Sequence, residues 1–101
     1  MKKIAEKLGT PALLEQTAEE CCELAHACLK MARKLRDENP TPKSIEDIQD
    51  NLVEELADVE LCIYAILSGT ELVERDEFIN KHAEKDERWH KRLDVSMDLD
   101  D

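Results

Sequence analysis

Two prolines, Pro40 and Pro42, interrupt a long helix-favouring stretch and therefore decide how this chain folds. Proline lacks the backbone N–H that a helix interior needs, and Asn39, which precedes a proline, is pushed toward extended geometry. The sequence thus predicts one helix over residues 11–37 and a second over residues 45–67. Helices joined by so short a turn lie antiparallel.

The ends of these helices carry recognisable signals. Thr10 precedes Pro11, a pair typical of a helix start because a threonine hydroxyl can cap free N–H groups and proline is tolerated in the first turn. Ser44 and Asp47 have the spacing of a capping box, which predicts the start of the second helix at Ile45. Gly69 is a natural stop for that helix.

A third helix is expected to start between residues 71 and 76 and to end near Leu93. Abundant Ala, Leu, Glu and Lys, with only three aromatic residues, favour an all-α fold. We expect a single domain over residues 1–101, with a disordered tail over 94–101. Because 101 residues bury a limited core, we expect the hairpin and third helix to complete a four-helix-bundle core through oligomerisation, as a homodimer or homotetramer.

The charge and hydropathy of the chain limit the kinds of partner that we expect it to bind. A formal net charge of -11 disfavours binding to a nucleic-acid polymer and suits binding of cations. The sequence has no stretch of about 20 apolar residues and no signal-peptide pattern, so we expect a soluble cytoplasmic protein without membrane contact. The four cysteines form no CxxC pair, which predicts reduced thiols acting as small core residues rather than zinc ligands.

One pattern occurs twice: Glu-Glu-x-x-Glu at residues 19–23 and Glu-Glu-x-x-Asp at 54–58. At 100° per residue, Glu20 and Glu23 project into the apolar sector of the first helix, and Glu55 and Asp58 into that of the second. Each of these pairs therefore interrupts a face that should be buried.

Convergence of these four carboxylates requires a cation. Each like-charged pair at about 5 Å is unfavourable by roughly 3 kcal/mol at an effective dielectric near 20. Carboxylate oxygens without histidine or cysteine are hard ligands, which indicates Mg²⁺, with Mn²⁺ as an alternative, held by Glu20, Glu23, Glu55 and Asp58. Glu19 and Glu54 lie at the edge of the apolar stripes, as outer ligands or as ordinary surface charge.

The motif EExxE followed by ExxD on the next helix resembles the metal signature of the MazG-like all-α nucleoside triphosphate pyrophosphohydrolases, and the resemblance spans residues 11–93. It implies Mg²⁺ ligation by Glu20, Glu23, Glu55 and Asp58, supported by Glu19. It also implies hydrolysis of a nucleoside triphosphate to the monophosphate and pyrophosphate, in an oligomer with a four-helix bundle. Asp86 departs from the family, which often has Asn there, and 31 residues separate Glu23 from Glu55, a long connection for the family.

For catalysis, Glu20 or Glu23 would orient a metal-bound water for attack on phosphorus. Phosphate contacts are expected on the third helix, where four basic residues recur at spacings of three and four, with ion pairing to Glu84 and Glu87 as the alternative. Trp89 is a candidate for stacking on the base, or a core or interface residue. The four basic residues are Lys81, Lys85, Arg88 and Arg92.

Two other functions fit parts of the sequence. Glu23 with His26 and Glu87 with His90 are both Glu-x-x-His, the motif that holds the two irons of ferritin-like carboxylate proteins. That hypothesis leaves Asp58 unexplained. A non-catalytic helical dimerisation module needs only the apolar stripes and makes no demand for acids at 20, 23, 55 and 58.

Overall fold

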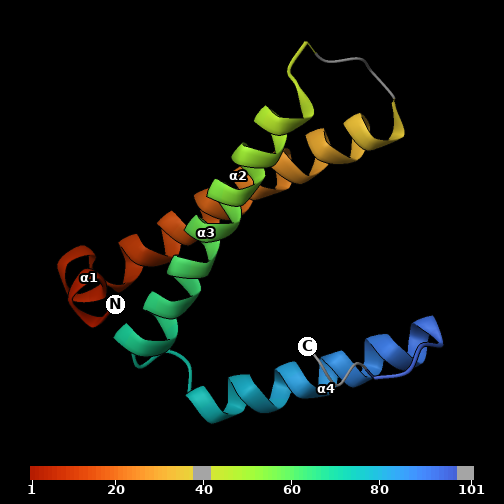
Figure 1. Ribbon diagram of the computed structural model, residues 1–101. Coiled ribbons are helices and arrows are strands. Elements are labelled where there is room, and N and C mark those ends of the chain that lie inside the picture. Colours follow the sequence, from red (N-terminus) through yellow and green to blue (C-terminus); the bar gives the residue numbers. More distant parts are fainter. Residues whose placement is uncertain (38–41, 98–101) are drawn as a thin grey trace.

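A computed structural model describes residues 1–37 and 42–97 and confirms an all-helical fold in that part of the chain, without strands. Two long helices form an antiparallel hairpin, a short helix packs at its open end, and the last helix projects away (Figure 1). The helices are α1 (Lys2–Leu8), α2 (Thr10–Arg36), α3 (Ile45–Gly69) and α4 (Arg75–Leu93).

The hairpin is held by a seam of residues spaced alternately three and four apart. Leu13 and Ala27 of α2 are buried, as are Ile48 and Cys62 of α3. On α2 the spacing continues through half-buried residues at 17, 20, 24, 31 and 34, so one stripe of the helix faces α3 along its length. The antiparallel hairpin predicted from the sequence therefore forms within one chain.

The predicted helix ends are largely confirmed. The Asp47 N–H donates to Ser44 Oγ at 3.2 Å, so the capping serine opens α3. Asp37 closes α2 in the left-handed conformation with φ 57°. The cap assigned to Thr10 was wrong, because Gly9 with φ 87° occupies the N-cap and Thr10 is already helical. Asn39 and Pro40, named as the helix breakers, lie outside the described residues.

Helix α1 was not predicted, and it packs on the end of α3. Ala5 is buried beside Leu13 and Ala65. A Cβ at Gly69 would overlap Ala5 Cβ and crowd the Met1 carbonyl oxygen, so the last residue of α3 must be glycine for α1 to approach this closely. Gly69 thus serves helix packing as well as helix termination.

Helix α4 has no buried residue and stands apart from the hairpin. Its N-cap is Glu74, whose carboxylate accepts from the backbone N–H groups of Asp76 and Glu77 at 3.2 and 3.0 Å. After the helix, the Val95 N–H donates to the His90 carbonyl at 3.0 Å. In the predicted tail over 94–101, residues 94–97 are therefore described and non-helical, and 98–101 lie outside the described residues.

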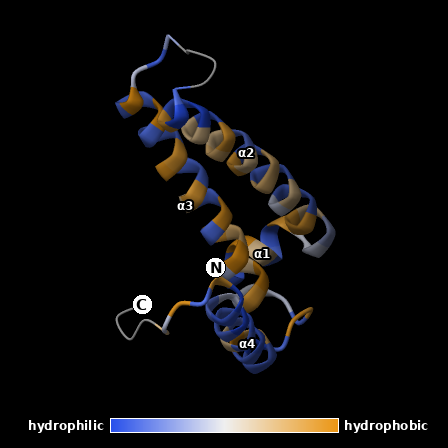
Figure 2. Cartoon of the chain, turned by 90° about the vertical axis from the view of Figure 1, so that its right-hand side faces the viewer, coloured by the Kyte–Doolittle hydropathy of each residue, from blue (hydrophilic) through white to orange (hydrophobic). Residues whose placement is uncertain are grey.

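The hairpin has two chemically different faces. Residues one position after the seam residues lie about 100° further round each helix, and because α2 and α3 are antiparallel, both offsets lead to the same face. On this face, here called the apolar face, are α2 residues such as Leu14 and α3 residues such as Val53 and Leu56, all exposed. Residues one position before the seam, including Glu23 and Asp58, lie on the opposite, acidic face. Figure 2 looks toward the apolar face, and α4 projects from the hairpin on this side.

The cysteines are all free, as predicted, but the prediction that they are core residues was wrong for three of them. Only Cys62 is buried, while Cys21, Cys22 and Cys28 are exposed. Cys21 and Cys28 fall on the apolar face, which a single chain does not cover. Within the described ranges, none of the helices has a stretch long and apolar enough to cross a bilayer.

We predict that Gly69→Ala lowers the free energy of unfolding by about 1 to 3 kcal/mol, as overpacking typically does, although alanine favours helix more than glycine. Urea unfolding measures this change. Ser68→Ala, at the exposed neighbouring position, is the control and should stay within about 0.5 kcal/mol of wild type. A Gly69→Ala protein as stable as wild type would show that α1 does not pack against this residue.

Candidate metal centre

Three carboxylates from the two long helices meet in the middle of the hairpin. Glu20 of α2 and Glu55 of α3 occupy seam positions, and Glu23 approaches from the acidic face one turn along α2. One carboxylate oxygen from each lies within 4.8 Å of the others. The sequence places acids at seam positions of both helices, and antiparallel packing then brings them to the same height.

Burial makes this group unusual among the many acids of the chain. Glu20 Oε2 and Glu55 Oε2 are both buried and have no hydrogen-bond partner among the described residues. The other oxygen of Glu20 accepts from Gln16 Nε2 at 2.7 Å. A buried carboxylate oxygen without a donor is costly, because the water lost on burial is not replaced.

The protonation of both seam glutamates reflects this crowding. Burial raises the pKa of Glu55, and the neighbouring Glu23 carboxylate raises it further. The hydrogen bond from Gln16 lowers the pKa of Glu20, but burial and the charges of Asp58 and Glu23 together outweigh it, so this pKa is also raised. The hairpin therefore disfavours the charged forms that a bound cation would stabilise.

The remaining predicted ligands lie around this group. Asp58 is exposed on the acidic face and outside the set of three, although its charge raises the pKa of both Glu20 and Glu55. Glu19 and Glu54 are also exposed on that side. The structure thus brings together Glu20, Glu23 and Glu55 closely, with Asp58 beside them and Glu19 further out.

An apolar pocket of about 220 Å³ opens beside the carboxylates. Glu20, Asp58 and Gln16 form the polar part of its wall. Helix α1 contributes much of the lining, so sequence analysis missed it together with that helix. The Gln16 contact was detectable, since Gln and Glu four residues apart on a helix commonly pair. The apolar lining is Met1, Ile4, Leu8, Leu13, Leu61, Cys62 and Ala65.

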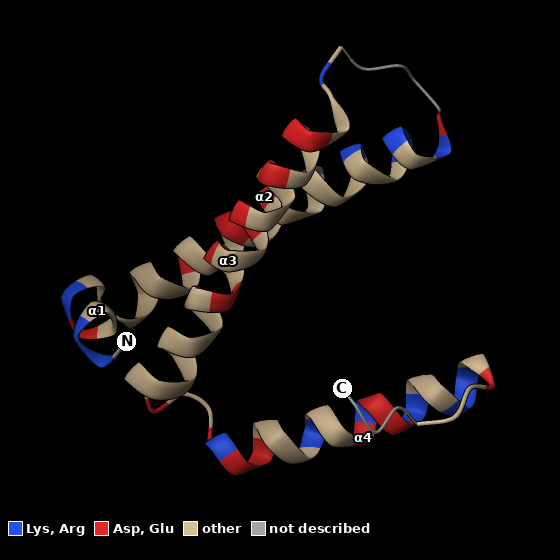
Figure 3. Ribbon diagram, viewed as in Figure 1, with Lys and Arg blue, Asp and Glu red and all other residues tan. Residues whose placement is uncertain are grey.

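The predicted phosphate-binding residues are not brought to the carboxylates of their own chain. Acidic residues follow the middle of the hairpin, whereas Lys81, Lys85, Arg88 and Arg92 lie on α4, on the side of the apolar face (Figure 3). Lys81 Nζ lies 3.0 Å from Glu84 Oε2, and this hydrogen bond and charge lower the pKa of Glu84. One of the four cations thus has the surface partner that the alternative interpretation expected.

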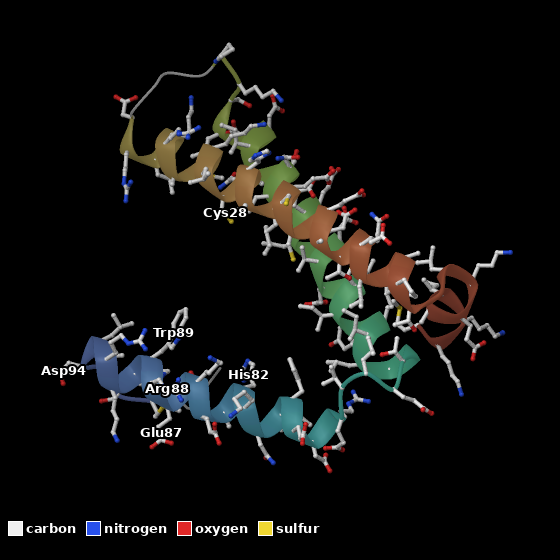
Figure 4. All side chains as sticks on the ribbon, turned by 180° about the vertical axis from the view of Figure 1, so that it is seen from behind. Cys28, His82, Glu87, Arg88, Trp89 and Asp94 are labelled. Atoms are coloured by element: carbon white, nitrogen blue, oxygen red, sulfur yellow. The ribbon has the colours of Figure 1, made fainter. Side chains whose placement is uncertain are left out.

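The proposed base-stacking residue is also on α4. Trp89 is 62% exposed and, with His82, points toward the hairpin across an open space (Figure 4). It lines a pocket of about 500 Å³ along α4, to which Val95 also contributes. In the isolated chain Trp89 is neither core nor close to the carboxylate group.

The ligands of a di-iron centre are likewise separated. Glu23 and His26 are on the hairpin, while Glu87 and His90 are on α4, with Glu87 directed away from the hairpin (Figure 4). His90 Nδ1 is 2.7 Å from the Asp86 carbonyl and 3.2 Å from Asp86 Oδ1. One chain does not assemble the two Glu-x-x-His motifs around a common point.

The donor set fits a hard divalent cation. Carboxylate oxygens are the ligands that Mg²⁺ and Mn²⁺ take, and no cysteine or histidine belongs to the group of three found among the described residues. The two buried oxygens without donors are positioned to receive such an ion. Comparisons with protein-family models, curated proteins and solved structures found no match for this chain. The assignment therefore depends on the residues themselves.

We predict that the metal-free protein binds Mn²⁺ and that Glu55→Gln weakens this binding by more than about tenfold, since even loss of a residue that supports a ligand has an effect of that size. Isothermal titration calorimetry measures the affinity. Glu15→Gln, an exposed acid on α2 outside the group, is the control and should bind like wild type. Equal affinity for wild type and Glu55→Gln would remove Glu55 from the ligand set.

The raised pKa of Glu55 predicts a pH dependence of stability. Because the folded chain takes up the proton more readily than the unfolded chain, this carboxyl destabilises the fold as pH rises from the ordinary value of 4.5 through the raised pKa. In EDTA, the stability of wild type relative to Glu55→Gln should therefore increase as pH falls from about 7 to about 5. Urea unfolding at one protein concentration tests this, with Glu54→Gln as the control that retains the wild-type dependence; a relative stability that rose with pH would contradict it.

Proposed function

We propose that this protein is a Mg²⁺-dependent nucleoside triphosphate pyrophosphohydrolase of the MazG-like type, releasing the nucleoside monophosphate and pyrophosphate. The observation that carries the proposal is the group of Glu20, Glu23 and Glu55, with two buried carboxylate oxygens that have no donor. Bound divalent cations would neutralise the triphosphate and increase the acidity of the attacking water. Mn²⁺ would serve in the same way.

Different residues of the chain would bind the metal ion and orient the attacking water. Glu20 and Glu55 hold the ion from the seam, and Glu23 and Asp58 complete its ligands from the acidic face, with Glu19 further out. Glu20 or Glu23 accepts a hydrogen bond from the attacking water and orients it. Gln16 fixes one oxygen of Glu20 through its bond of 2.7 Å, while the second oxygen is buried and has no donor among the described residues.

The pocket beside Glu20 and Asp58 suits the nucleoside end of the substrate. It is apolar over most of its lining and polar where it meets the carboxylates, as expected for a site that excludes water from a base while the phosphates face the ions. The net charge of -11 supports a small nucleotide bound through metal rather than a nucleic-acid polymer. We propose a cytoplasmic enzyme, where such substrates occur.

Homo-oligomer formation would bring the basic residues of α4 close to the carboxylates of a partner chain. Helix α4 projects from the hairpin on the side of the apolar face (Figure 2). In a dimer joined through the apolar faces, each α4 would extend past that face toward the acidic face of the other copy. Lys81, Lys85, Arg88 and Arg92 would then contact phosphates bound at the partner's carboxylates, and Trp89 would lie close to the partner's nucleoside pocket. A homotetramer would pair two such dimers.

The non-catalytic dimerisation module remains the alternative, since the exposed apolar face alone supports it. That hypothesis gives no reason for buried acids in the seam of both helices. Apolar residues at 20 and 55 would serve a dimerisation module better, because unpaired buried acids destabilise the fold.

We predict that purified protein with Mg²⁺ releases pyrophosphate, rather than orthophosphate, from a nucleoside triphosphate in a panel that includes dUTP and dCTP. Glu55→Gln and Asp58→Asn should each lower kcat/KM by roughly 100-fold or more, because they remove groups that hold the ion at the attacking water. Pyrophosphate and orthophosphate assays measure the products. Glu15→Gln is the control; absence of turnover with every nucleotide, or activity that survives both substitutions, would contradict the proposal.

A mixing experiment tests whether α4 acts on the other copy. Glu55→Gln protein and a Lys85→Ala/Arg88→Ala double variant should each be nearly inactive. When they are unfolded together and refolded, half of the dimers are mixed and each has one intact site, so activity should recover to about a quarter of wild type. Mixed dimers without recovered activity would show that α4 does not serve the partner's site.

A further inference from the structure

Helix α2 carries a second repeating stripe, one position after the seam residues, on the apolar face. Read along the chain, the residue types are Leu, Ala, Cys, Ala, Cys, Ala and Leu, an order that is the same in both directions about Ala25. All are exposed in the single chain except Ala32, which is half-buried. The stripe consists of Leu14, Ala18, Cys21, Ala25, Cys28, Ala32 and Leu35.

This order matches its own antiparallel copy. Consider a two-fold axis at Ala25 and a rise of about 1.5 Å per residue. Measured from this axis in the same direction along the helix, Cys28 then lies at about 4.5 Å and Cys21 of the second copy at about 6 Å. The same operation sets Leu14 opposite Leu35 and Ala18 opposite Ala32. A symmetric dimer interface requires this mutual complementarity, in which residue i meets j and j meets i.

The charges beside the stripe are complementary in the same arrangement. On the outer edge of α2, one further position round the helix, the N-terminal half carries Glu15 and the C-terminal half carries Arg36. An antiparallel copy therefore sets Glu15 opposite Arg36, twice per dimer. A parallel copy would set like charges together.

The solvent-exposed surface area of the single chain is large enough for the apolar face to be covered by a partner. A compact chain of 11.6 kDa exposes about 5,800 Å², whereas this chain exposes 8237 Å². The excess of about 2,400 Å² exceeds the roughly 800 Å² per partner that a stable interface buries. Val53 and Leu56 of α3, 64% and 50% exposed, widen the same face beside the stripe.

We infer that the occupant of this face is a second copy of the chain, packed antiparallel along α2 with the two-fold axis at Ala25, so that Cys21 of each copy lies against Cys28 of the other. The small residues of the stripe let the two helices approach closely, and the leucines close both ends. Cys28 lies on the side of α2 that faces α4, where a second hairpin would sit (Figure 4). This inference deepens the homo-oligomer of the proposed function, but it is tested by association alone and does not depend on catalysis.

The first arm of the test disturbs the axis. Ala25→Arg puts two like charges against each other at the two-fold, so light scattering should show the wild type as a dimer and this variant as a monomer at the same concentration. Circular dichroism checks that the helix content is retained. Ala12→Arg, at an exposed position of α2 on the acidic side, is the matched control and should remain dimeric.

The second arm determines the register through the thiols, in a Cys22→Ser/Cys62→Ser background. Diamide takes two protons and two electrons from a thiol pair and becomes the hydrazine, while a disulfide forms between Cys21 and Cys28 of the two copies. A non-reducing gel should show a covalent dimer. Further change of either Cys21→Ser or Cys28→Ser should abolish it, because neither residue then faces a thiol.

Mixing these two single-thiol proteins should restore the covalent dimer, since one copy supplies Cys28 and the other Cys21. The inference fails if the wild type is monomeric, if Ala25→Arg remains dimeric, or if either single-thiol protein cross-links with itself. It also fails if the mixture does not cross-link. Each of these results is obtained from association and cross-linking, whereas metal affinity and pyrophosphate release are measured separately, so failure here is distinct from failure of the proposed function.

Discussion

The repulsion between acidic side chains in the seam of the hairpin is the constraint on which the rest of the structure depends. Glu20 and Glu55 belong to a seam whose buried residues in α2 and α3 are leucine, alanine, isoleucine and cysteine. Apolar contacts along both helices hold the acids together, and only one of their four oxygens, in Glu20, receives a side-chain hydrogen bond that is described. A domain with about 5 to 15 kcal/mol of total stability has little to spare for such a group unless it serves a purpose.

The period of the helix lets α2 serve three surfaces with one repeating pattern. Its seam positions pack on α3, the positions before them include the acids Glu19 and Glu23, and the positions after them carry alanine, cysteine and leucine. Because each set is offset by about 100°, the carboxylates and the apolar face lie on opposite sides of a hairpin only two helices wide. Metal binding and self-association can therefore occupy one pair of helices without competing for surface.

Periodicity was enough to predict the hairpin, its serine cap at Ser44 and the convergence of Glu20, Glu23 and Glu55. It failed where the outcome depends on packing between distant segments. A seven-residue helix such as α1 is marginal alone and forms against Gly69, which local sequence does not reveal. The cysteines were assigned to the core because small residues usually pack there, but helical spacing alone does not say whether a second stripe is covered by the same chain. Similarly, the spacing of the basic residues on α4 was predicted correctly, but the distance of these residues from the carboxylates was not evident from the sequence.

The offset between seam and faces has a consequence for how such a chain can change in length. Removing one residue within α2 before Glu20 would rotate everything preceding it by about 100°, turning Leu13 and Thr17 out of the seam while the acids stayed in place. An insertion inside α3 would have the same effect on Ile48. The connection from Asp37 to Ser44 lies between the two helices, so a change in its length does not rotate any seam residue of α2 or α3. Evolutionary insertions and deletions should therefore be confined to it.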